Sequence, residues 1–154
     1  MSIAVPVAYT LHLLASIVWV GGMFFALLAL RPAAGELPPD KRLGLWKRVF
    51  SRFFPWVWVA VIMLVTTGYW ILFTVFGGVA SAKPHVHVML ASGGLMALLY
   101  TYLWLSPWRS MQVFLNTEDL QRAAQQQARI RRIMVLNLTL GLFTAVIGAL
   151  GRFL

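Results

Sequence analysis

The sequence contains no cysteine and only four acidic residues, and both facts exclude several classes of site. The lack of cysteine excludes disulfides, thiolate metal ligands and a cysteine nucleophile. Charged residues make up 11% of the 154 residues, whereas a soluble domain carries about 25%. Phosphate-binding glycine loops and nucleophile–histidine–acid sets are also missing. Any catalysis is therefore expected to be redox chemistry carried by a cofactor.

Apolar residues, by contrast, make up 60% of the chain and gather in four blocks. A helix needs roughly 20 residues to cross a bilayer, and the blocks provide spans at about residues 5–30, 55–76, 85–105 and 133–150. No basic residue precedes the first block, so we interpret it as a retained helix and not a cleaved signal. The sequence predicts an all-α fold: an integral membrane four-helix bundle that forms one domain over residues 1–154.

The basic residues are distributed unevenly between the two sides of this bundle. Of the 13, all except Lys83 and Arg152 fall in the two longer loops: Arg31, Lys41, Arg42, Lys47, Arg48, Arg52, Arg109, Arg122, Arg129, Arg131 and Arg132. Positively charged loops stay in the cytoplasm, so the N-terminus and the C-terminus are both expected to be periplasmic. We expect a multi-pass protein of the bacterial inner (plasma) membrane. Its net charge of +9 then faces the lipid bilayer and its anionic headgroups and not a nucleic acid.

The connections between the spans also carry local signals. Asp40 follows Pro38-Pro39 and is expected to cap a short amphipathic helix on the membrane surface. The third helix is expected to stop before Ser106-Pro107. Thr117 is expected to begin the fourth helix, whose polar first part extends into water.

Three histidines lie on the side that we expect to be periplasmic, and polar groups inside a bilayer are costly. His12 lies about two turns into the first helix, and His85 and His87 begin the third. Two histidines on two helices can supply both axial ligands of haem b, which predicts His12 as one ligand and His87, or less strongly His85, as the other. The alternative is structural: each imidazole simply bonds a carbonyl or headgroup water.

Other residues near this level would suit a haem. Lys83 and Arg152 are the basic residues available to its propionates, and Trp19 offers an aromatic neighbour. With both axial positions filled, the haem is expected to transfer electrons, with a quinone or a periplasmic redox protein as partner. Any turnover would be that of a haem-dependent membrane oxidoreductase. The sequence does not indicate whether the protein is a monomer or an oligomer.

Copper is the competing chemical interpretation. His85, Met89 and Met96 are spaced to share one face of the third helix, with His87 beside them. Imidazole and thioether donors suit Cu(I), although methionine is also a common apolar filler. A third interpretation is an accessory subunit of a membrane complex. It rests on a small-residue seam in the fourth helix, which comprises Asn137, Gly141, Thr144, Gly148 and Gly151.

Several motifs along nearly the whole chain resemble those of the CopD-type membrane family. They are residues 11–14 (LHLL), 17–23 (IVWVGGM), 85–89 (HVHVM), 131–133 (RRI) and 151–153 (GRF). The resemblance implies copper uptake across the inner membrane. The chain is also similar to the related HemJ-type proteins, which bind b-type haem and oxidise protoporphyrinogen. That similarity implies a haem ligand at His12 and a functional lysine at Lys83, although Pro84 and two histidines beside Lys83 depart from the HemJ pattern.

Overall fold

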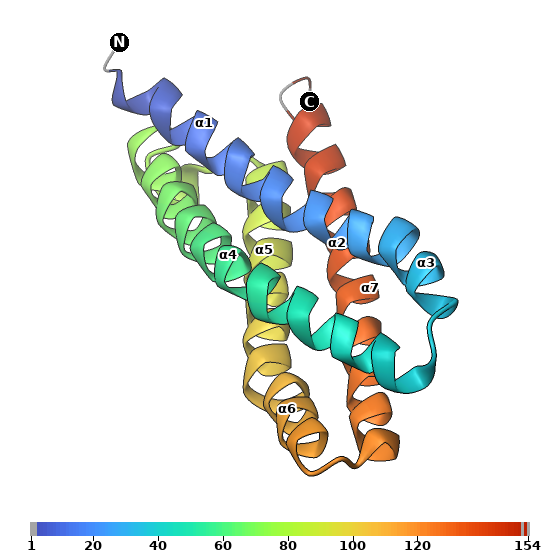
Figure 1. Cartoon of the computed structure of the whole chain (residues 1–154). Helices are drawn as coiled ribbons and strands as arrows, with labels where there is room; N and C mark the ends of the chain where they lie inside the picture. Colours follow the sequence, from blue (N-terminus) through green and yellow to red (C-terminus); the bar gives the residue numbers. More distant parts are fainter. Residues whose placement is uncertain (1–2, 152, 154) are drawn as a thin grey trace.

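A computed structural model of the chain describes residues 3–151 and residue 153, and they are helical almost throughout (Figure 1). Among these residues, four continuous helices are long and apolar enough to cross a membrane. They run over Ala4–Gly35, Pro39–Thr74, Pro84–Asn116 and Leu120–Leu150. The all-α four-helix prediction is therefore confirmed. Each helix extends beyond its predicted span at one end or at both, although the second ends at Thr74, before the predicted end at residue 76.

The first helix is built of three α-helical pieces in line. α1 (Ala4–Ser16), α2 (Gly22–Phe25) and α3 (Arg31–Gly35) are joined by π-helical turns at Ile17–Gly21 and Ala26–Leu30. A π-helical turn shifts the side chains that follow it around the helix axis. The two turns therefore decide which residues of this long helix face its neighbours.

The second helix, α4 (Pro39–Thr74), is continuous, so the prediction of a separate surface helix was wrong. Asp40 lies in its first turn and does not cap it. The reason is packing: the apolar side of the predicted surface segment is buried against the bundle and continues into the span. Its buried residues are Leu43, Trp46, Phe50, Phe54 and Val57. This burial keeps the helix intact through Pro55, which on its own disfavours a helix interior.

The third helix also runs further than its sequence predicted. α5 (Pro84–Leu103) passes through a π-helical turn at Trp104–Trp108 into α6 (Arg109–Asn116). The expected stop before Ser106-Pro107 was therefore wrong. Pro107 lacks an amide proton, and the widened π-helical turn accommodates it. Because Pro107 and Trp108 are both buried, packing stabilises this irregular stretch.

The fourth helix, α7 (Leu120–Leu150), starts at a later residue than predicted. Its N-cap is Asp119, whose side chain accepts a hydrogen bond from the Arg122 backbone amide at 3.0 Å. Thr117 instead bonds back to the Val113 carbonyl at 3.2 Å and belongs to the end of α6. A carboxylate stabilises a helix start better than a hydroxyl because it also faces the positive end of the helix dipole.

The helices form two antiparallel pairs (Figure 1). α1 lies along α4, and α5 with α6 lies along α7. A short loop with a 3-10 turn at Val79–Ser81 joins α4 to α5, and α1 begins at the end of the bundle where α7 ends. We refer below to the α1–α4 pair and the α5–α7 pair.

A cluster of aromatic rings holds the two pairs together. Phe54 stacks on Phe50 with ring centroids 4.9 Å apart and meets Trp108 edge-on at 5.3 Å. Tyr100 meets Phe54 edge-on at 5.9 Å and donates a hydrogen bond from its hydroxyl to the Phe54 carbonyl at 2.8 Å. Trp19 is 3% exposed and meets Tyr100 edge-on at 6.0 Å. Edge-on and offset ring pairs each contribute about 0.5–1.5 kcal/mol beyond their buried area.

Candidate functional site

One face of α5 packs its nitrogen and sulfur donors against the small residues of α7. We call this contact the α5–α7 seam and define it by two sets of residues: His85, Met89, Ser92 and Met96 on α5, and Asn137, Gly141, Thr144, Gly148 and Gly151 on α7. The His85 ring lies directly against Gly151, where a side chain would overlap it. A Cβ atom on Gly148 would lie 3.2 Å from the Met89 sulfur. One on Gly141 would lie 3.1 Å from the Met96 methyl carbon.

Two hydrogen bonds, one from Thr144 and one from Asn137, join α7 to α5 along the same seam. Thr144 Oγ1 donates to Ser92 Oγ at 2.7 Å, and Ser92 Oγ donates to the Val88 carbonyl at 2.8 Å. Asn137 Nδ2 donates to the Met96 carbonyl at 3.3 Å. The seam therefore presents, in order along α5, an imidazole, a thioether, a hydroxyl and a second thioether. The structure brings His85, Met89 and Met96 together on one packed face, and their role as metal ligands stays a prediction.

His12 belongs to the other helix pair and is held by a hydrogen bond. Its Nδ1 lies 2.8 Å from Thr67 Oγ1 on α4. Because the Thr67 hydroxyl donates its own proton to the Met63 carbonyl at 2.5 Å, it accepts from His12. His12 then carries its proton on Nδ1 and keeps a lone pair on Nε2. Gly68 leaves room for the ring, since a Cβ atom there would lie 3.3 Å from His12 Cε1.

Among the described residues, the structure shows no contact between His12 and the other residues predicted to hold a haem. Within the described part of the chain, no hydrogen bond or ring contact links His12 to His85 or His87. His85 instead meets the Phe76 ring edge-on at 6.5 Å. His87 and Lys83 are exposed. Arg152 lies outside the described residues. The pairing of His12 with His87 on one haem thus stays a prediction without a contact to support it.

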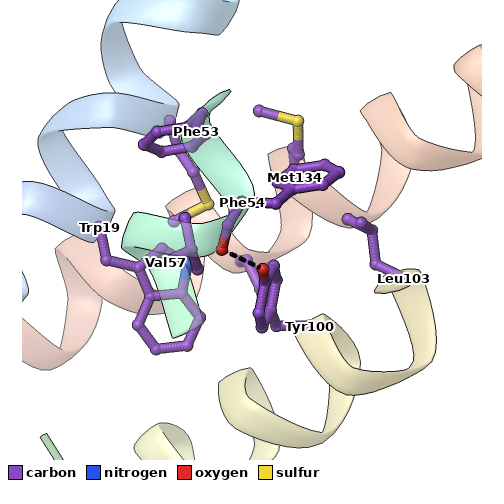
Figure 2. A pocket seen from close by; sticks show the side chains of 9 residues that line it. Trp19, Phe53, Phe54, Val57, Tyr100, Leu103 and Met134 are labelled. Atoms are coloured by element: carbon purple, nitrogen blue, oxygen red, sulfur yellow. Dashed lines mark hydrogen bonds between the residues drawn. The ribbon is translucent and has the colours of Figure 1, made fainter. Parts of the chain in front are cut away.

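A small cavity lies between the two helix pairs, next to the aromatic cluster (Figure 2). Its volume is about 10 Å³, and its lining residues are Trp19, Met23, Phe53, Phe54, Val57, Tyr100, Leu103, Met134 and Asn137. Asn137 is 1% exposed, and its Oδ1 has no hydrogen-bond partner. Sequence reasoning assigned Asn137 to helix packing and overlooked Met134. The spacing of these two residues, one turn apart on α7, was the available signal.

No group of three or more histidine, aspartate and glutamate side chains gathers anywhere among the described residues. The imidazole and thioether groups described above are the candidate metal ligands that we consider in this part of the chain. They suit a soft metal ion better than a hard one, because thioethers are soft ligands.

Four long apolar helices, with imidazole and thioether donors packed between them, define a multi-pass membrane protein. The chain belongs to the CopD family, since the family model described as copper resistance protein D matches residues 47–150. The match covers the α5–α7 seam except Gly151, together with most of α4, and it excludes His12. No curated protein and no solved structure matches the chain. Membership of the family links the protein to copper resistance.

Proposed function

We propose that this protein binds Cu(I) and conducts it along the α5–α7 seam across the bacterial inner membrane. One observation carries the proposal: the seam aligns His85, Met89 and Met96 inside a packed helix contact. The family match supports it, because it covers His85, Met89 and Met96 and the family is described as copper resistance protein D.

The chemistry of the seam suits a monovalent soft ion. Thioethers and a neutral imidazole bind Cu(I) without adding charge to the membrane interior, where carboxylates would be costly. His85 and Met96 are 11 residues apart on one helix, which corresponds to about 16 Å along its axis. Conduction needs sites that bind well enough to accept an ion and weakly enough to release it, and a row of thioethers provides such sites.

The direction of transfer follows from the predicted topology. On the topology that we predict from the basic loops, the His85 end of α5 is periplasmic and the α6 end is cytoplasmic. Cu(I) would therefore enter at His85 and move past Met89 toward Met96. Impermeant thiol labelling of single cysteines placed at Ser81 and at Glu118 tests this topology: we expect labelling from outside at Ser81 only.

Copper accumulation in cells that carry the seam variants tests the function itself. We expect His85→Ala and Met89→Leu to lower the accumulation of copper toward the level of a deletion strain. Met111→Leu is the matched control, because Met111 is fully buried but lies outside the seam. Equal accumulation of copper in the deletion strain and the wild type would contradict the proposal.

A b-type haem held by His12 is the second candidate, and the hydrogen bond to Thr67 favours it. A histidine that donates one ring N–H to a fixed acceptor presents its other nitrogen as a ligand in a set orientation. A haem bound there would supply electron transfer, with a quinone or a periplasmic redox protein as partner. A reduced-minus-oxidised spectrum of the purified protein tests this candidate beside His12→Ala, His85→Ala and His87→Ala. Protein that shows no Soret absorption after haem-replete expression would exclude it.

A further inference from the structure

The cavity between the two helix pairs contains a buried oxygen atom whose orientation is determined by a hydrogen bond. Asn137 Nδ2 donates to the Met96 carbonyl at 3.3 Å, which identifies the amide nitrogen and leaves Oδ1 as the free atom. The side chain is 1% exposed, so neither water nor lipid headgroups reach it from outside. A buried carbonyl oxygen without a partner lowers stability, so it suggests an occupant that the oxygen can bind.

The space beside this oxygen admits only one small species. A volume of about 10 Å³ is near the lower limit for a single water molecule. A buried water needs two to four polar partners. Besides Asn137, the lining offers the Tyr100 hydroxyl, whose oxygen can still accept although its proton is bonded to the Phe54 carbonyl, and the Trp19 indole N–H. These groups are enough for one water molecule, which an ion that entered the cavity would displace.

The other donors in the lining are two thioethers from different helices. Met23 belongs to α2 and Met134 to α7, and they are 2% and 3% exposed. Figure 2 shows the Met134 side chain among the rings that surround the cavity. The two thioethers are soft donors, the amide oxygen is a harder one, and none of the three carries a charge. Because thioethers are the majority, the set favours a soft monovalent cation over a hard divalent one. Methionine side chains are flexible enough to adjust around such an ion.

The cavity also lies at one end of the α5–α7 seam. Asn137 joins the two features, because its nitrogen bonds the backbone carbonyl of Met96, the last methionine of the seam, and the same side chain lines the cavity. On the far side, Phe53, Phe54 and Leu103 complete the lining. An ion that left Met96 would therefore meet the thioethers of this cavity before it reached the cytoplasmic end.

We propose that this cavity is a Cu(I) coordination site formed by Met23 Sδ, Met134 Sδ and Asn137 Oδ1. The inference rests on the proposed copper function and adds a holding site at the inner end of the seam. The aromatic rings of the lining would slow the release of the ion from the cavity. The α5–α7 seam would deliver Cu(I), and this site would hold it.

Anaerobic titration of the full-length protein in lipid nanodiscs with Cu(I), against a chromogenic competing chelator, tests the site. Loss of groups that merely support a metal ligand lowers affinity by about 10–100-fold. We therefore expect Met23→Leu with Met134→Leu to weaken the tightest Cu(I) equivalent by at least about tenfold. Met111→Leu is the matched control, since Met111 is 0% exposed but does not line the cavity. X-ray absorption of the wild type with one equivalent of Cu(I) should show two sulfur neighbours, which are lost in the double variant.

The outcomes separate this inference from the proposed function. One outcome is Cu(I) binding that is unchanged in Met23→Leu with Met134→Leu and lost in His85→Ala with Met89→Leu. That result would overturn the cavity site and would still agree with Cu(I) binding at the seam. A wild type that binds no Cu(I) at all would overturn both. The wild-type absorption spectrum does not depend on how well any variant folds, so a first shell without sulfur would overturn the cavity site by itself.

Discussion

The two helix pairs each contain a histidine near the same end of the bundle, but they hold it in different ways. In the α1–α4 pair, His12 is oriented by a hydrogen bond to Thr67. In the α5–α7 pair, the His85 ring packs against Gly151, and the thioethers of Met89 and Met96 follow it along the seam. A hydrogen bond fixes one tautomer and one direction, whereas a glycine contact supplies room without direction. The first arrangement suits a fixed ligand, and the second suits an ion that moves.

The largest expected effect is on the contact of α7 with the first helix. A Cβ atom on Gly141 would lie 2.8 Å from Val20 Cγ2, and a valine side chain is too stiff to move aside. We expect Gly141→Ala to lower the free energy of unfolding by about 1–3 kcal/mol through overpacking. Thermal unfolding in detergent measures the change. Gly93→Ala is the control: Gly93 has no neighbour within 4 Å of its Cβ position, so that variant should be neutral or more stable.

The next effect concerns the contact between the pairs. Tyr100→Phe removes the hydrogen bond to the Phe54 carbonyl and keeps the ring packing. We expect a loss of about 1 kcal/mol, measured as a lower unfolding temperature. Tyr102→Phe is the matched control because Tyr102 is 53% exposed. Equal unfolding temperatures for the two variants would mean that ring packing alone joins the pairs.

A smaller effect tests how His12 is held. Thr67→Val removes the hydroxyl that accepts from His12 and keeps the shape of the side chain. Hydrogen bonds between membrane helices contribute about 0.6 kcal/mol on average, and we expect a loss of that size. Thr66→Val is the control, since Thr66 bonds only carbonyls of its own helix. If both variants lose the same stability, His12 is not oriented by Thr67.

The smallest change in stability is expected at Gly148, where the effect should appear in metal binding. A Cβ atom there would meet the Met89 methyl carbon at 2.9 Å, and that flexible end can move aside. We expect Gly148→Ala to change the unfolding free energy by less than about 0.5 kcal/mol while weakening Cu(I) binding, because the thioether is displaced. Cu(I) titration and thermal unfolding of the same sample measure both. Unchanged Cu(I) affinity would argue against Met89 as a ligand.

Much of the fold could be predicted because hydropathy acts locally. The four apolar blocks and the all-α class follow from composition along the chain. The positions of the helix ends were predicted least well, because Pro55 and Pro107 both lie inside helices. Proline disfavours a helix interior only through local geometry, and burial of Phe54 and Trp108 outweighs that effect. Neither burial is visible in the local sequence.

For the candidate site, the sequence by itself determined which donors exist and which of them share a helix face. His85, Met89 and Met96 lie on one face because helical spacing requires it. The tertiary structure decided the rest: that His12 faces Thr67, that the seam faces glycines, and that Met23 and Met134 line one cavity with Asn137. These are contacts between distant segments. They depend on how each helix is rotated and paired, which packing across the whole bundle determines.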